Sequence, residues 1–181
     1  MVITNYFLKK EIRKLTRKVS ERPHQYRSMD DINTILFLCD SKDWDIIRSC
    51  IEKLRVMNKT VNTAIFAATK KDVPTWYSNY LLLRADKDVN LFGFPDKMLQ
   101  RQFYHLPADL LIDFTSLQAT PLYYMCLRHP STFKAGIKQS ETSVYDFTII
   151  PPSDENNNIL YLFDQLVNYL KTIGSKNMIN N

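Results

Sequence analysis

The sequence predicts an α/β domain with three layers, in which helices cover both faces of a mainly parallel, Rossmann-like sheet of about five to six strands. Two observations support this prediction. Apolar runs at 34–39 and 108–114 are nearly unbroken, which is typical of strands buried on both faces of a parallel sheet. Segments with one apolar helical face alternate with these and other short apolar runs. A basic helix precedes the domain.

The basic helix is predicted over 5–19, where apolar residues recur at helical spacing on one narrow stripe. These residues are Leu8, Ile12, Leu15 and Val19. Pro23 favours a break, because the residue before a proline avoids helical geometry. We therefore divide the chain into a helix and linker over 1–27, a single α/β domain over 28–174 and a disordered tail over 175–181.

A strand–helix–strand unit opens the domain. The strand at 34–39 leads into 40–43, a segment rich in helix-capping residues, which is expected to open a helix over 44–57. Residues 60–67 form the second strand. The crossover between these parallel strands is expected to be right-handed.

The next segment is predicted to reach one edge of the sheet. It holds an extended run at 80–84 and a further possible strand at 89–92. Gly93 ends this region, and Pro95 is expected to begin a helix at its first position.

The last part of the domain adds three strands and two helices. In chain order they are a strand at 108–114, a helix starting at 120, strands at 132–137 and 145–150, and a helix over 157–173. Lys134 is expected to interrupt its strand, and Gly136 to close it. Gly174 is expected to cap the last helix.

The most economical strand order puts 34–39 and 108–114 side by side, with earlier strands on one side and later strands on the other. Ligands of open α/β sheets bind beyond the carboxyl ends of the strands, where the strand order reverses. This order is expected to bring 40–41 close to 115–116.

The composition argues against several kinds of binding site and against a membrane segment. With only 3 glycines, the chain contains neither a dinucleotide fingerprint nor a Walker phosphate loop. Its 3 cysteines form no C-x-x-C pair, which argues against a disulfide framework or a zinc knuckle. No apolar run has the length of a signal-peptide core or a membrane span. We expect a cytoplasmic protein with buried free cysteines and without a metal or cofactor.

Polar side chains at the predicted reversal of strand order form a candidate ligand site. They are Asp40, Ser41, Asp113, Thr115, Ser116 and Gln118. A crevice there suits a sugar or an anion, and its two carboxylates could share acid–base work if one raised the pKa of the other. The alternative is structural: Asp40 and Ser41 cap a helix, and Asp113 binds backbone amides of the adjoining loop.

Two cysteines are weaker candidates for chemistry. No motif joins Cys39 to a histidine, so a buried structural thiol is favoured over a nucleophile. Cys126 and His129 supply two potential metal ligands, and no second pair completes a zinc site.

Aromatic residues between 76 and 94 could stack a base or sugar, form a partner interface, or close the edge of the core beneath a loop. They are Trp76, Tyr77, Tyr80, Phe92 and Phe94. The sequence leaves these interpretations open.

The positive charge of the chain resides in its first 27 residues, where eight bases and two acids give +6 and leave −1 of the total of +5 for 28–181. The candidate surface for an anionic partner consists of Lys9, Lys10, Arg13, Lys14, Arg17 and Lys18. RNA, the ribosome or a protein partner would suit this surface. A membrane is less favoured, because the apolar stripe is narrow and lacks tryptophan. The alternative is a solvated helix that packs on the domain through that stripe.

Four segments carry a resemblance over nearly the whole chain: 7–10 (Phe-Leu-Lys-Lys), 88–95 (Asp-Val-Asn-Leu-Phe-Gly-Phe-Pro), 109–113 (Asp-Leu-Leu-Ile-Asp) and 166–171 (Leu-Val-Asn-Tyr-Leu-Lys). With them the chain resembles a family of small uncharacterised bacterial proteins, a domain of unknown function, which implies no activity. Over 109–138 it is also similar to the N-terminal, Rossmann-like half of heptosyltransferase-type glycosyltransferases. That likeness implies a fold and an acceptor-type pocket, but not transferase activity, since the chain has no room for a donor-binding domain.

The sequence favours a non-enzymatic protein that contacts an anionic macromolecule or partner through its basic helix. The alternative is a small-molecule-binding protein or enzyme that uses the crevice at the ends of the central strands.

Overall fold

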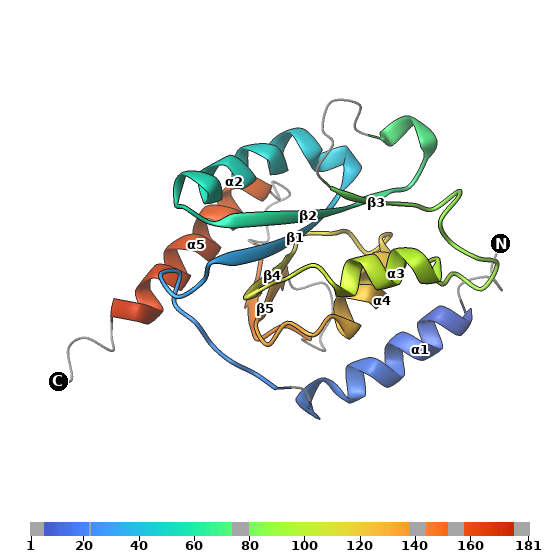
Figure 1. Ribbon diagram of the computed structural model, residues 1–181, viewed down its shortest axis with the longest axis horizontal. Coiled ribbons are helices and arrows are strands. Elements are labelled where there is room, and N and C mark those ends of the chain that lie inside the picture. Colours follow the sequence, from blue (N-terminus) through green and yellow to red (C-terminus); the bar gives the residue numbers. More distant parts are fainter. Residues whose placement is uncertain (1–5, 22, 74–79, 138–143, 152–157, 176–181) are drawn as a thin grey trace.

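The computed structural model describes residues 6–21, 23–73, 80–137, 144–151 and 158–175 (Figure 1). Within them, six parallel strands form one sheet in the order β3-β2-β1-β4-β5-β6. The strands are β1 (Thr34–Asp40), β2 (Thr60–Ala67), β3 (Leu81–Arg84), β4 (Leu110–Asp113), β5 (Lys134–Ile137) and β6 (Phe147–Ile149). This confirms the predicted parallel sheet. The strands predicted at 34–39 and 108–114 correspond to β1 and β4 and lie at its centre.

Helices cover both faces of the sheet (Figure 1). In the described residues they are α1 (Tyr6–Arg17), α2 (Trp44–Val56), α3 (Lys97–Tyr104), α4 (Thr120–Arg128) and α5 (Ile159–Ser175). Helices α2 and α5 pack on one face, and α3 and α4 on the other, with α1 against α4. No helix in this part of the chain combines the length and the apolar character needed to span a membrane.

The side chains of β1 divide between two cores. Ile35, Phe37 and Cys39 contact the core beneath α2 and α5, whereas Leu36 and Leu38 contact the core beneath α3 and α4. All five are fully buried. The strand is therefore apolar on both faces, which is why its sequence shows no alternation.

Helix α1 is fixed to the domain by its apolar stripe. Leu8 is 0% exposed, and Ile12 and Leu15 are partly buried in the same core. The linker that follows is also held: the ring Nδ1 of His24 contacts the carboxylate of Asp146. The helix therefore packs on the domain, as the structural alternative expected.

The possible strand at 89–92 is wrong, because this segment is a turn. Only an isolated antiparallel bridge joins Val89 to Pro95. The Asn90 side-chain oxygen accepts hydrogen bonds from the N–H groups of Phe92 (2.9 Å) and Phe94 (3.0 Å), and Gly93 has a φ of 88°. The short amide side chain satisfies the backbone locally, so it needs no neighbouring strand.

Some predicted helix ends and caps also differ. Helix α3 starts at Lys97 rather than Pro95, because Asp96 caps it by accepting hydrogen bonds from the N–H groups of Met98 (2.7 Å) and Leu99 (3.3 Å). Before α2, neither Asp40 nor Asp43 makes a side-chain capping bond.

At the other end of the chain, α5 runs through Gly174 to Ser175, so the glycine does not cap it. The tail was predicted over 175–181, but Ser175 belongs to α5; residues 176–181 lie outside the described residues.

Lys134 does not interrupt β5 but joins it to the end of α4. The side chain is buried, and its Nζ donates to the carbonyl oxygens of Cys126 (2.7 Å), Leu127 (3.3 Å) and His129 (2.8 Å). The last carbonyls of a helix lack intrahelical partners and carry partial negative charge. The lysine supplies both hydrogen-bond donors and positive charge at that point.

Replacing Lys134 with methionine should remove the charged donor shared by these carbonyls, leaving Cys126 O with the His129 N–H at 3.3 Å. We expect Lys134→Met to lower the free energy of unfolding by at least about 2 kcal/mol, since a buried unsatisfied group costs about 1–3 kcal/mol. Urea unfolding followed by circular dichroism measures this. The matched control, Lys97→Met at an exposed position, should change stability by less than about 0.5 kcal/mol. Equal effects of the two substitutions would contradict the assigned role of Lys134.

Candidate functional site

The carboxyl ends of β1 and β4 meet where the strand order reverses. The backbone N–H of Ser116 donates a hydrogen bond to Asp40 Oδ2 at 2.8 Å, across 76 residues of sequence. The expected closeness of 40–41 and 115–116 is therefore confirmed.

A hollow of about 220 Å³ lies at this point. Its lining consists of Asp40, Ser41, Lys42, Phe66, Ala68, Asp72, Ser116 and Gln118. Four of the six residues expected from the sequence are among them. The other four are Lys42 in the 3-10 turn Ser41–Asp43, Phe66 and Ala68 at the end of β2, and Asp72 in the 3-10 turn Lys70–Asp72. No local sequence pattern revealed that these segments meet.

Asp40 is the unusual member of this lining. Its residue is only 5% exposed, and Oδ2 is used by the Ser116 N–H. The second oxygen, Oδ1, is buried and has no hydrogen-bond partner among the described residues. The side chain does not cap α2, so the capping alternative does not account for it.

Asp113 and Thr115 do not line the hollow; they are buried and bonded to each other. Asp113 Oδ1 accepts hydrogen bonds from the backbone N–H (2.9 Å) and the hydroxyl (2.6 Å) of Thr115. Asp113 Oδ2 accepts one from the Tyr145 hydroxyl at 2.8 Å. Burial raises the pKa of Asp113, and these donors act in the opposite direction. The expected contact of Asp113 with a loop amide is thus present.

Tyr145 could not be found from sequence spacing, since it lies 32 residues from Asp113. Its ring packs over Gly136 in β5, where an added Cβ would come within 2.7 Å of the ring. A glycine inside a strand often marks such a close approach, so Gly136 was the feature of the sequence that indicated a close neighbour at this strand.

His129 and Cys126 do not form a metal site. The backbone N–H of Ser131 donates to His129 Nδ1 at 3.1 Å, so Nε2 carries the proton and donates to the Leu106 carbonyl at 3.0 Å. Burial lowers the pKa of His129 to about 4. In the described part of the chain, no three His, Cys, Asp or Glu side chains are grouped to hold a metal.

The thiol of Cys39 is fully buried beneath α2. Burial, and then the neighbouring Asp40 charge, raise its pKa well above the ordinary value. A thiol with a raised pKa is a poor nucleophile, because the thiolate is the reactive form.

The second candidate surface is the exposed face of α1. Lys14 Nζ lies 3.2 Å from a carboxylate oxygen of Glu11, and Lys18 Nζ lies 4.0 Å from one of Glu21. The remaining bases are exposed and have no ion-pair partner among the described residues; they are Lys9, Lys10, Arg13 and Arg17.

Of the aromatic candidates, Trp76 and Tyr77 lie outside the described residues. Tyr80 and Phe94 are partly buried at the edges of the two cores. Phe92 is 54% exposed, and its ring meets that of Phe7 on α1 edge to face, with centroids 5.3 Å apart. An exposed aromatic pair therefore adjoins the basic face of α1.

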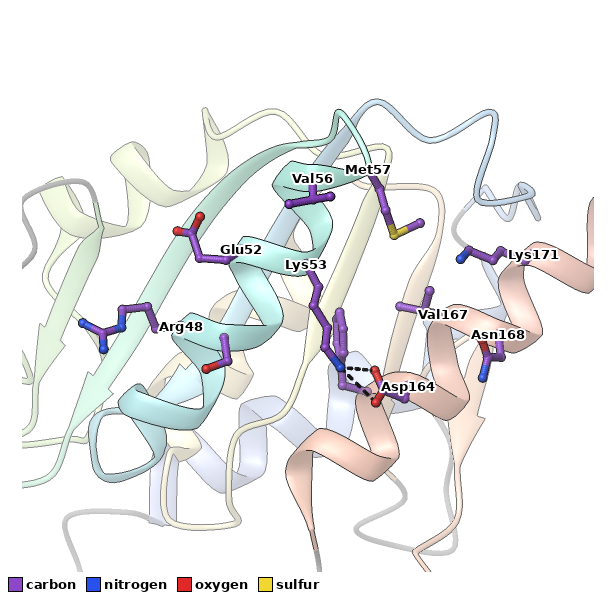
Figure 2. A pocket seen from close by; sticks show the side chains of 11 residues that line it. Arg48, Glu52, Lys53, Val56, Met57, Asp164, Val167, Asn168 and Lys171 are labelled. Carbon is purple, nitrogen blue, oxygen red and sulfur yellow. Dashed lines mark hydrogen bonds and ion pairs between the residues drawn. The ribbon is translucent and has the colours of Figure 1, made fainter.

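A larger hollow, of about 720 Å³, lies between α2 and α5 (Figure 2). Lys53 crosses it and pairs with Asp164, with Nζ–O distances of 2.7 and 3.0 Å. None of the buried unpartnered side-chain atoms in the described residues lines this groove. The groove therefore presents no buried polar atom of the described residues that lacks a partner, and no site was predicted there.

Gly136→Ala should destabilise the protein through Tyr145, because the new methyl group would lie too close to the ring. We expect a loss of about 1–3 kcal/mol. In a Tyr145→Ala background the same substitution should cost much less, and chemical denaturation of the four proteins gives this coupling energy. The same cost in both backgrounds would show that the ring is not the cause.

Protonation of His129 should contribute to acid unfolding. Its folded pKa is about 4, below the ordinary value of about 6.5, so the unfolded chain binds the extra proton first. Stability from the neutral ring is therefore full above about pH 6.5 and is lost as the pH falls towards 4, by on the order of 3 kcal/mol.

The control for this pH dependence is His129→Asn, which keeps an acceptor for the Ser131 N–H but does not titrate. Urea unfolding across this pH range should show wild type losing more stability than the variant. Parallel pH profiles of the two proteins would refute the assignment.

Comparison with known proteins gives a family but no activity. No curated protein matches the chain, and no solved structure matches it. The model of a family of unknown function (DUF6913) matches residues 5–173, which include both the basic helix and the whole sheet. The chain belongs to this family of unknown function.

Proposed function

We propose that the protein is a non-enzymatic binding protein that holds single-stranded RNA on the exposed face of α1. The observation that supports this is a row of basic side chains without an ion-pair partner among the described residues, namely Lys9, Lys10, Arg13 and Arg17. Residues three and four apart share a helix face. At about 1.5 Å per residue, residues 10 and 17 lie about 10 Å apart along the helix. Such a row can meet successive phosphates of one strand.

The attachment of α1 to the domain favours this use. Because Leu8 is buried, the helix is already ordered and oriented before any partner arrives, which lowers the entropy lost on binding. The rest of the chain carries a net charge of only −1 over 28–181. Electrostatic attraction to a polyanion is therefore concentrated on one face.

RNA fits the surface better than a membrane does. The apolar stripe of α1 is already packed against the domain, so it is not free to insert between lipids. The exposed rings of Tyr6, Phe7 and Phe92 lie beside the basic side chains of α1. Base stacking on aromatic rings next to a row of cations is how proteins hold single strands without reading sequence.

The test is binding of a fluorescently labelled, mixed-sequence RNA strand, measured by anisotropy at several salt concentrations. Lys10→Ala, Arg13→Ala and Arg17→Ala combined should weaken binding and lower the slope of log K against log salt by about 2, at about 0.7 per phosphate contact. Alanine keeps the helix intact.

The matched control removes the same charge elsewhere, by Lys70→Ala, Lys71→Ala and Lys87→Ala at exposed positions. It should leave the affinity and the salt slope nearly unchanged. The proposal fails if both triple variants bind equally well, or if wild type binds RNA independently of salt. Binding of an acidic protein but not RNA by the α1 face would also overturn it.

A further inference from the structure

We propose a second binding site, in the hollow at the carboxyl ends of β1 and β4, for a small molecule that donates hydroxyl or amino hydrogens to Asp40. A monosaccharide and an amino sugar are the two sources of this chemistry that we consider. No residue of α1 lines the hollow, so this site is independent of the proposed RNA surface.

The unpaired oxygen of Asp40 is the first support. The hydrogen bond from Ser116 N–H holds Oδ2. Oδ1 is buried without a donor among the described residues, and the residue itself lines the hollow. A ligand donor in the hollow therefore reaches Oδ1 when the carboxylate turns towards it. Buried polar groups are almost always paired, and leaving one unpaired is costly. A donor from a bound molecule would remove that cost.

The rest of the lining favours a donor rather than an anion. Asp72 adds a second carboxylate, against the single cation of Lys42. A phosphate would therefore meet two like charges, one of them largely desolvated, which is unfavourable. Of the two ligand classes suggested by the sequence, a sugar and an anion, these charges favour the sugar.

The remaining side chains suit a hydroxyl-bearing ligand. Ser41, Ser116 and Gln118 can each donate and accept hydrogen bonds, and Phe66 adds an aromatic ring. The volume of about 220 Å³ is below the range of about 300–1,000 Å³ that holds drug-sized ligands. The site therefore suits a molecule of monosaccharide size.

The test uses the full chain labelled with ¹⁵N, with the Ser116 amide as the reporter because it bonds to Asp40. The probes are D-glucose, D-glucosamine and inorganic phosphate, each titrated through the millimolar range. We expect a saturable shift of the Ser116 resonance with glucose or glucosamine and none with phosphate. Which sugar binds more tightly distinguishes a hydroxyl from an amino donor.

Asp40→Asn replaces the unpaired acceptor with an N–H₂ donor, while the amide oxygen can still accept from Ser116. It should weaken sugar binding by about tenfold or more, because a hydrogen bond to a charged group contributes about 1.5–3 kcal/mol. Ala68→Leu, at an exposed position in the lining, should also weaken binding by filling the hollow. It guards against a folding defect in the first variant.

The matched control is Asp45→Asn, which removes the same charge at an exposed position outside the hollow and should bind like wild type. The proposal is overturned if neither sugar shifts the Ser116 resonance of wild type. It is also overturned if phosphate alone shifts it, or if Asp40→Asn and Ala68→Leu both bind the sugar as tightly as wild type. None of these results bears on RNA binding by α1, so the two proposals fail separately.

Discussion

The fold depends on the seam between β1 and β4, the line along which these two central strands pair. At each end of this seam a carboxylate accepts backbone hydrogen bonds from the other segment. At the amino end, Asp109 Oδ2 accepts hydrogen bonds from the backbone N–H groups of Asn33 (3.0 Å) and Thr34 (2.9 Å). At the carboxyl end, Asp40 Oδ2 accepts one from Ser116. These contacts help to fix the register of two strands that lie far apart in sequence. The position of every other strand, and the meeting of polar loops at the hollow, follows from that pairing.

Several polar side chains that the fold buries or half-buries find partners in the backbone. Burial acts to raise the pKa of Asp109, but the two N–H donors and Arg27 hold it below the ordinary value. Lys134 binds carbonyls at the end of α4, and Asp113 binds the Thr115 N–H. Four buried side-chain atoms of the described residues have no hydrogen-bond partner, namely Arg27 Nε, Asp40 Oδ1, Thr63 Oγ1 and Ser131 Oγ. Of these four residues, Asp40 is the one that lines the hollow at the carboxyl ends of β1 and β4.

The sequence predicted what depends on local pattern and missed what depends on tertiary contact. Unbroken apolar runs identified the central strands, because both faces of each are buried. The stripe through Leu8 identified the N-terminal helix but left open whether it packs on the domain. The turn at Asn90 was missed, since its side chain replaces strand pairing with local hydrogen bonds. The role of Lys134 was predicted wrongly, and the contact of Tyr145 with Asp113 was not predicted. Their partners belong to other elements, at sequence separations that produce no periodic pattern.

The central seam also sets the order in which the nascent chain can complete its sheet. Ile35 pairs with Leu110, 75 residues later, and at about 5–20 residues per second synthesis of that interval takes about 4–15 s. Until then β1 has a neighbour on one side only, and its other edge offers unpaired N–H and C=O groups. A bare apolar edge is a template for pairing with another chain. The segment that ends at Asp113 is therefore also the one whose arrival covers this open edge of the growing sheet.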